Sequence, residues 1–187
     1  MATSMSRQIG NRELFLESGT FAKLAEGGAV ARYGDTMVLA TCVSSNPREG
    51  IDFFPLTIDV EERMYAAGKI PGGFFRREGR PSETAILTAR LTDRPMRPSF
   101  RDGYRDEVQV VITVLSVDMA RQYDIPGMNA ASLATMLSGI PFEGPVGSVR
   151  LGLIECGWRI NPTFQELVVA TVDIVVAGRR NELGEVQ

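Results

Sequence analysis

The sequence predicts an α+β domain, in which helices pack on one side of a mixed sheet. Three observations support this class. Apolar and β-branched runs of strand length recur along the whole chain. Two helix-length segments, at 81–94 and 129–137, interrupt them. The chain has 187 residues, 44% of them apolar, which is enough to bury one substantial core.

The first half of the chain predicts strands joined by short turns. We expect these strands at 13–17, 29–32, 37–44 and 53–60. The turn at 33–36 between the second and third strands favours an antiparallel meander. Pro55 places the fourth strand at a sheet edge or a bulge, because proline cannot donate to the hydrogen-bond ladder. Residues 1–11 are expected to form an N-terminal tail, so that the domain spans 12–187.

A helix should begin at Pro81, since proline suits the first helical turn. Pro95 should end it, because a proline inside a helix removes a hydrogen bond and clashes with the preceding turn. Its apolar stripe is expected to be Leu87 and Leu91, with Ile86 beside it.

The second half of the chain predicts further strands and helices. We expect strands at 107–117, 146–154, 158–160 and 172–177, and helices at 129–137 and 164–169. The segment at 158–160 could pair with the strand before it as a hairpin. After the last strand only a short polar end follows from Arg179. We therefore expect the domain to be incomplete at its C-terminal end.

Composition excludes several kinds of site. The chain has no histidine, which removes imidazole general bases, Ser-His triads and His-ligated metals. A metal would need carboxylate, phosphate or water ligands, which suit magnesium or manganese. Cys42 and Cys156 lie in apolar runs, so we expect buried free thiols and a reducing, cytoplasmic location. No apolar run reaches the roughly 18 residues that a membrane span needs.

Basic residues are concentrated in one part of an acidic chain. Residues 63–105 hold ten basic and four acidic residues, a net +6, which leaves −9 for the remainder of a chain whose total is −3. Lys23 and Lys69 are the only lysines. Arginine binds phosphate in a bidentate manner and stacks on bases, so this local patch favours an anionic ligand.

Residues 64–80 predict a long irregular loop, because five glycines and prolines interrupt them at 68, 71, 72, 73 and 79. Within the loop, Phe74 and Phe75 are followed by Arg76 and Arg77. Aromatic rings that stack on bases beside guanidiniums that hold phosphates would bind RNA. Alternatively, the phenylalanines anchor the loop in the core and the arginines are solvated. The residues alone leave both interpretations open.

Two other charged groups are candidates for ligand binding. Arg90 and Arg94 lie one helical turn apart and Arg97 follows shortly after, so the three could bind phosphate groups. Ion pairing with Asp93 is the alternative that periodicity favours. Acidic residues at 52, 59, 61 and 62 could hold magnesium, but without a third ligand nearby a solvated strand face is favoured.

These stretches together resemble the polynucleotide phosphorylase family from about Arg12 to Gly178. The resemblance is carried by DFFPL at 52–56, YAAGKIPGGFFRREGRPSE at 65–83, RLTDRPMRP at 90–98, EVQVVITVLS at 107–116, LSGIPFEGP at 137–145 and DIVVAG at 173–178. It implies a ribonuclease-PH-like fold, also described as ribosomal-protein-S5-domain-2-like. The chain would be the first of two such halves in each subunit of a trimer.

The resemblance also implies a function. The family degrades single-stranded RNA from its 3′ end by attack of inorganic phosphate, with Mg²⁺ or Mn²⁺, and it can join RNA-degradation complexes. The implied RNA-binding residues are Phe74, Phe75, Arg76, Arg77 and Arg80. The residues implied to face phosphate or the RNA backbone are Arg90, Arg94 and Arg97.

Catalysis is expected elsewhere. In the family's active second half, the position of Asp173 holds an aspartate, with a lysine two residues later and another aspartate six residues earlier. Here Val175 and Leu167 occupy those two positions. The resemblance therefore implies that this half has no catalytic residue and holds no metal, and that Asp173 is structural. The alternatives are a free-standing ribonuclease PH or exosome-ring subunit, against which the loop argues, and a non-catalytic RNA-binding scaffold.

Overall fold

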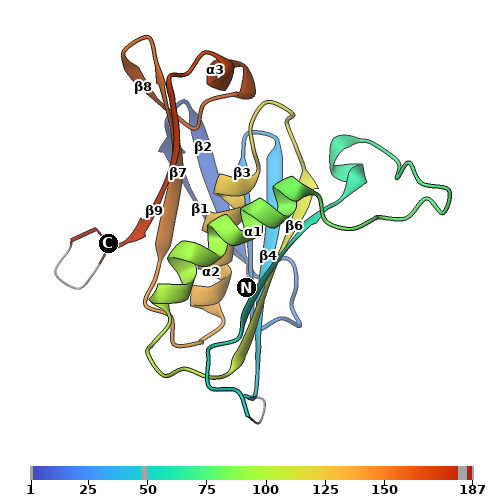
Figure 1. Ribbon diagram of the computed structural model, residues 1–187, viewed down its shortest axis with the longest axis vertical. Coiled ribbons are helices and arrows are strands. Elements are labelled where there is room, and N and C mark those ends of the chain that lie inside the picture. The colour runs from blue at the N-terminus through green and yellow to red at the C-terminus, as the bar shows by residue number, and fades with distance from the viewer. Residues whose placement is uncertain (1, 48–49, 181–184, 187) are drawn as a thin grey trace.

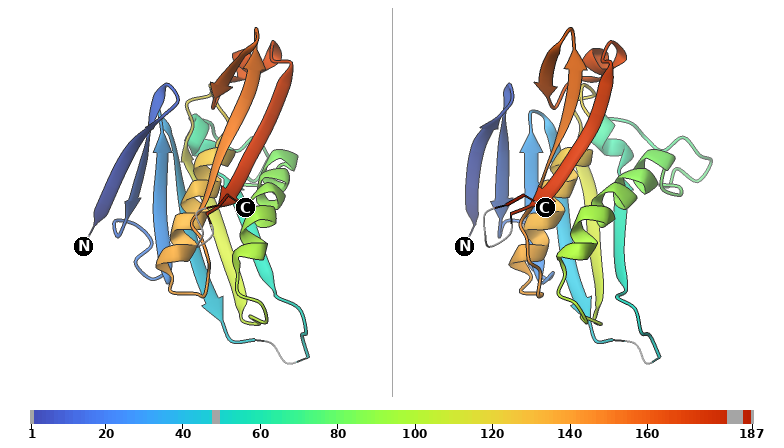
Figure 2. Two further views of the ribbon diagram at one scale, coloured as in Figure 1. Left: turned by 90° about the vertical axis from the view of Figure 1, so that its left-hand side faces the viewer. Right: turned by 60° about the vertical axis from the view of Figure 1, so that its left-hand side comes forward.

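The computed structural model describes residues 2–47, 50–180 and 185–186 (Figure 1). Two sheets and two long helices make up the fold. Helices α1 (Glu83–Met96) and α2 (Asp124–Leu137) pack against the larger sheet, and the smaller sheet covers the other side of α2 (Figure 2). The predicted α+β class is confirmed. No helix among the described residues is long and apolar enough to cross a membrane.

The larger sheet has six strands in the order β1-β2-β3-β4-β6-β5. Their bounds are Thr3–Ile9 for β1, Arg12–Ser18 for β2, Gly27–Tyr33 for β3, Thr36–Ser45 for β4, Leu56–Glu62 for β5 and Glu107–Ser116 for β6. Strands β1 to β4 form the antiparallel meander that the turns predicted. The prediction that residues 1–11 form an N-terminal tail is wrong. Most of this segment is β1, which pairs along its whole length with β2.

Strand β5 does not continue the meander. It lies at the edge of the sheet and pairs in parallel with β6, which separates it from β4. The edge position agrees with the prediction from Pro55, and the strand begins at the residue after it. The next segment carries a short 3-10 helix, η1 (Met64–Ala67), and is otherwise irregular up to α1, as predicted.

The smaller sheet has the order β8-β7-β9, with β7 at Val146–Ile154, β8 at Gly157–Ile160 and β9 at Val172–Arg179. It includes the expected hairpin. A short helix, α3 (Phe164–Val168), begins with a capping box between Thr163 and Glu166. Residues 181–184 and 187 of the expected polar end lie outside the described residues.

The buried face of α1 differs from the predicted stripe. Ile86 and Leu87 are about half exposed, at 50% and 56%. The buried residues are instead Ala85, Thr88, Thr92 and Met96. Small side chains at helical spacing let α1 lie close to β5. The buried Thr92 hydroxyl donates a hydrogen bond to the Thr88 carbonyl. The helix also runs past Pro95, which sits in its last turn.

Helix α2 begins five residues earlier than predicted and is buried between the two sheets. The alanines of α2 let the helix lie very close to β3, and this close approach requires a glycine at position 27 of β3. A Cβ added at Gly27 would lie 1.9 Å from the Ala134 carbonyl oxygen. The prediction for the cysteines is half right: Cys42 is buried under α2, but Cys156 is exposed in the turn between β7 and β8.

Candidate functional site

The most exposed aromatic residues lie in the irregular segment at 68–80, which we call the 68–80 loop. It extends away from the body of the sheet (teal in Figure 1). Phe74 is 95% exposed and Phe75 is 78% exposed. Neither ring enters the core, so the anchoring alternative from the sequence is wrong. Two large apolar rings in water are stabilised only when something covers them.

The tip of the loop is a compact aromatic turn. The two phenylalanine rings meet edge to face, with centroids 5.3 Å apart and an angle of 85° between their planes. The amide of Arg76 donates to the Gly73 carbonyl at 2.9 Å, and Arg76 takes a left-handed backbone conformation with φ of 48°. A Cβ at Gly72 or Gly73 would meet no atom within 4 Å. Open space surrounds the tip, so a ligand can approach its backbone closely.

The arginines of this loop are available to a ligand. Arg76, Arg77 and Arg80 are exposed, and no hydrogen bond or ion pair occupies their side chains within the described residues. The acidic residue between them, Glu78, turns away and accepts a hydrogen bond from the Met64 amide. The loop therefore presents uncompensated positive charge beside its two rings.

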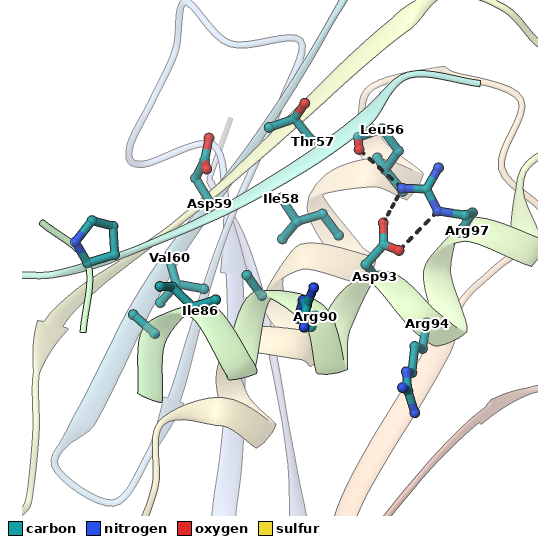
Figure 3. Close-up of a pocket in the computed structure, with 13 residues that line it drawn as sticks. Leu56, Thr57, Ile58, Asp59, Val60, Ile86, Arg90, Asp93, Arg94 and Arg97 are labelled. Atoms are coloured by element: carbon teal, nitrogen blue, oxygen red, sulfur yellow. Dashed lines mark hydrogen bonds and ion pairs between the residues drawn. The ribbon is translucent and has the colours of Figure 1, made fainter. Parts of the chain in front are cut away.

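Arg90 and Arg94 of α1, together with Arg97 directly after the helix, lie on a groove between the helix and β5 (Figure 3). The groove has a volume of about 650 Å³. Arg90, Arg94 and Arg97 line it, although the Arg94 side chain points away from β5 in the view of Figure 3. A second cavity, of about 540 Å³, lies between the base of the 68–80 loop and the end of β5. The structure thus places the loop and the α1 arginines along the same edge strand.

Arg97 is used within the fold. Its guanidinium donates to both carboxylate oxygens of Asp93, at 2.6 and 3.0 Å, and to the carbonyls of Phe54 and Leu56. The ion-pairing alternative therefore describes Arg97. Arg90 and Arg94 have no such partner in the part of the chain that the structure describes, so their donors remain open to phosphate.

The acidic residues near β5 are engaged in other contacts. Asp59 accepts from the Gln109 side-chain amide at 3.2 Å, Glu61 pairs with Arg63, and Glu62 accepts from the Tyr123 hydroxyl at 2.7 Å. Across residues 2–47, 50–180 and 185–186, no three Asp, Glu, His or Cys side chains are grouped as a metal site would require.

Asp173 lies on the smaller sheet, apart from these arginines, and Arg150 holds it. Arg150 donates to the Asp173 carboxylate at 2.8 Å and to the Asp124 carboxylate at 2.7 Å. In the pairing of β7 with β9, Arg150 stands opposite Val175 and Gly152 stands opposite Asp173. Leu167 approaches the same part of β7, because a Cβ added at Gly152 would lie 3.7 Å from a Leu167 methyl group.

This arrangement does not suit a divalent cation. The Asp173 carboxylate already faces a guanidinium, and Val175 and Leu167 offer no ligand atom. Sequence reasoning missed both Arg150 and Asp124. A signal was present: an arginine inside the apolar run 146–154 is a charge that needs a buried partner.

Comparison with known proteins adds to this geometry. Residues 10–141 match the 3′ exoribonuclease family, domain 1. The chain is 61% identical over 176 residues to the polyribonucleotide nucleotidyltransferase of Frankia alni, covering 94% of this chain and 24% of that protein. It is 61% identical over 172 residues to that of Acidothermus cellulolyticus, covering 91% and 22%. With that of Salinispora tropica, identity is 56% over 186 residues, covering 99% and 24%. The chain spans about a quarter of the length of these relatives.

The fold is also similar to a solved structure. The crystal structure of rice (Oryza sativa) Rrp46 superposes with a TM-score of 0.67, covering 100% of this chain and 77% of that one. Sequence identity is 13%, so this likeness concerns the fold alone. The ribonuclease-PH-like fold expected from the sequence is confirmed.

Proposed function

Because this chain belongs to the 3′ exoribonuclease family, as its domain 1, we propose that it is the RNA-holding half of a polyribonucleotide nucleotidyltransferase. The proposed reaction shortens RNA from its 3′ end by attack of inorganic phosphate and releases nucleoside diphosphates. Catalysis with Mg²⁺ or Mn²⁺ is assigned to a second ribonuclease-PH-like half. A homotrimeric ring, a role in mRNA catabolism, partners in RNA-degradation complexes and a cytoplasmic location belong to the same proposal.

One observation carries the proposal: the 68–80 loop presents two exposed rings beside three arginines that have no side-chain partner among the described residues. Base stacking on an aromatic ring contributes about 1–3 kcal/mol per base and accepts any sequence. Phosphate contacts by arginine add a term that weakens with salt. A degradative enzyme that must accept any RNA needs this combination of strength and sequence tolerance.

The neighbourhood of Asp173 supports the assignment of catalysis to another half. Phosphorolysis passes through a highly charged transition state, which cations must stabilise. In this chain the carboxylate is paired with Arg150, which also pairs with Asp124, and Val175 and Leu167 are apolar. These contacts hold β7, β9 and α2 together and neutralise the carboxylate with a guanidinium in place of a metal ion.

The test is an RNA-binding measurement on the double variant Phe75→Ala/Arg76→Ala. A labelled single-stranded RNA is titrated with protein at low salt and at higher salt, with fluorescence anisotropy as the readout. We expect affinity to fall about tenfold or more, since the variant removes one stacking ring and one phosphate-binding guanidinium. The same substitutions should slow degradation of long RNA by an intact enzyme.

The matched control is Phe53→Ala/Arg7→Ala, which removes an exposed phenylalanine and an exposed arginine outside both the 68–80 loop and the basic segment 63–105. Its affinity should stay within about twofold of wild type. Equal affinity of both double variants and wild type at low salt would exclude the loop as the RNA site.

Two alternatives remain distinguishable. A free-standing ribonuclease PH or exosome-ring subunit is less well supported, because the relatives reported above at 56–61% identity are named polyribonucleotide nucleotidyltransferases. A non-catalytic RNA-binding scaffold would share the binding result. It would differ in turnover: a longer protein that contains this chain would then release no nucleoside diphosphates from RNA.

A further inference from the structure

The 68–80 loop has very little attachment to the rest of the molecule. Two backbone hydrogen bonds, Gly68 to Tyr65 and Lys69 to Met64, close its first residues on η1. From residue 70 to residue 80, the described part of the chain shows one hydrogen bond that leaves the loop, from the Met64 amide to the Glu78 carboxylate at 3.0 Å. Within the described residues, this contact is thus the one hydrogen bond that joins the limb carrying the aromatic tip to the rest of the domain.

The other end of the contact is firmly placed. Met64 is the first residue of η1, and the first N–H groups of a helix have no partner within it. The side chain of the preceding residue, Arg63, makes no capping hydrogen bond to this end. The amide of Val117, just after β6, donates to the Ala66 carbonyl at 3.2 Å and ties η1 to the sheet. The Glu78 carboxylate thus fastens the returning limb of the loop to the body of the domain.

From this geometry we propose that Glu78 is the positioning residue of the RNA-holding loop. Its carboxylate supplies the missing acceptor for the Met64 amide and so sets where Phe74, Phe75, Arg76 and Arg77 stand. The proposal rests on the proposed function, because positioning has meaning only if the tip binds RNA.

Because Glu78 is negatively charged, the proposal and simple electrostatics predict opposite changes in RNA affinity when the residue is removed. An acid between Arg77 and Arg80 repels phosphates, so by electrostatics alone its removal should strengthen RNA binding. Glu78 also forms no ion pair with these arginines within the described residues. If it positions the loop, its removal should weaken binding even though a repulsive charge has gone.

Two substitutions separate these effects. Glu78→Gln removes the charge and keeps a side-chain oxygen that can accept from the Met64 amide, whereas Glu78→Ala removes both. We expect Glu78→Ala to weaken binding of a labelled single-stranded RNA about threefold to tenfold, the size of one hydrogen bond. Glu78→Gln should bind as tightly as wild type or more tightly. Unchanged or tighter binding by Glu78→Ala, or an equal loss in both variants, overturns the proposal.

The donor can be removed independently. Met64→Pro deletes the amide, proline is favoured at the first position of a helix, and Arg63 already has the extended conformation (φ −91°, ψ 127°) that a following proline requires. Met64→Pro should match the loss of affinity of Glu78→Ala, and the double variant should lose nothing further. Additive losses would show that the two residues act separately and would overturn the proposal.

The proposal and the proposed function fail in different ways. If Phe75→Ala/Arg76→Ala leaves affinity unchanged, the loop does not hold RNA, and both fail together. If that variant binds weakly while Glu78→Ala binds as wild type does, the loop holds RNA but Glu78 does not position it. The thermal unfolding midpoint of each variant, compared with wild type, shows whether a loss of affinity reflects the loop or the whole fold.

Discussion

The guanidinium of Arg150 lies 2.7 Å from the carboxylate of Asp124, joining the middle of β7 to the first residue of α2. Both side chains are nearly buried, with 13% and 3% of their surface exposed. The same guanidinium reaches Asp173 on β9. One guanidinium therefore connects three elements, in the region that holds the catalytic residues in the family's active second half.

Removing one partner of this pair should destabilise the fold strongly. We expect Asp124→Ala to lower the free energy of unfolding by about 3–5 kcal/mol, because it leaves a buried guanidinium without its closest carboxylate. Glu143→Ala is the control, since Glu143 pairs with Arg179 but is 62% exposed; its cost should stay below about 1 kcal/mol. Urea unfolding measures both. Equal costs for the two variants would contradict the structural role given to Arg150.

The three arginines on the groove between α1 and β5 should divide into two kinds. Arg90→Ala/Arg94→Ala should weaken RNA binding and reduce its salt dependence. The slope of the logarithm of the binding constant against the logarithm of the salt concentration should fall in magnitude by about 0.7 for each phosphate that is no longer neutralised. Its stability should remain within about 0.5 kcal/mol of wild type, because neither side chain has a partner among the described residues.

Arg97→Ala should behave in the opposite way. It removes hydrogen bonds to Asp93 and to the carbonyls of Phe54 and Leu56, so we expect it to cost about 1–2 kcal/mol of stability. RNA affinity, measured where the variant is fully folded, should change little. If the Arg97→Ala variant is as stable as wild type but binds RNA poorly, Arg97 contacts phosphate together with Arg90 and Arg94.

The 187-residue chain should not degrade RNA. Incubated with single-stranded RNA, inorganic phosphate and Mg²⁺, it should release no nucleoside diphosphate above the protein-free background, because Asp173 is paired with Arg150 and no three Asp, Glu, His or Cys side chains are grouped among the described residues. Chromatography of the products measures this, with an active polyribonucleotide nucleotidyltransferase as the positive control. Phosphate-dependent release would place catalysis in this half.

The two thiols should react at very different rates. Cys156 is exposed, whereas Cys42 is fully buried and its burial raises the pKa of its thiol, which keeps it protonated and shielded. At about pH 8 in native buffer, a thiol reagent should therefore modify one cysteine quickly and the second only after unfolding. Cys156→Ser should abolish the fast phase. Two fast thiols in the native protein would show that the sheet around Cys42 opens readily.

Alkaline pH should weaken the contact between Tyr123 and Glu62. Burial, and then the hydrogen bond that it donates to Glu62, raise the pKa of the Tyr123 hydroxyl. A pKa raised in the folded state gives stability that is complete below the ordinary tyrosine pKa of about 10 and is lost as the pH rises toward the raised value. The stability advantage of wild type over Tyr123→Phe should therefore shrink above about pH 10.

Denaturant unfolding at a series of pH values, from neutral upward, measures this advantage. Tyr65→Phe serves as the control, because Tyr65 is 58% exposed and its substitution should change the free energy of unfolding little. A constant gap between wild type and Tyr123→Phe across the alkaline range would contradict the assignment.

Local features of the sequence were sufficient for much of the fold. The strands of the smaller sheet, the meander of β2 to β4 and the hairpin after Ile154 follow from apolar alternation and turn residues, which depend on neighbours a few positions apart. The chemistry of the 68–80 loop was also visible, because glycines, phenylalanines and arginines in one short run already define an irregular, aromatic and cationic segment.

Only the tertiary structure determined which residues far apart in the chain become partners. Arg97 bonds to a carbonyl 43 positions away, and Arg150 pairs with a carboxylate 26 positions away. The exposed phenylalanines, the parallel pairing of β5 with β6 and the contact of Glu78 with Met64 are of the same kind. Burial and hydrogen-bond satisfaction depend on which segments meet in space, and local periodicity carries no information about those meetings.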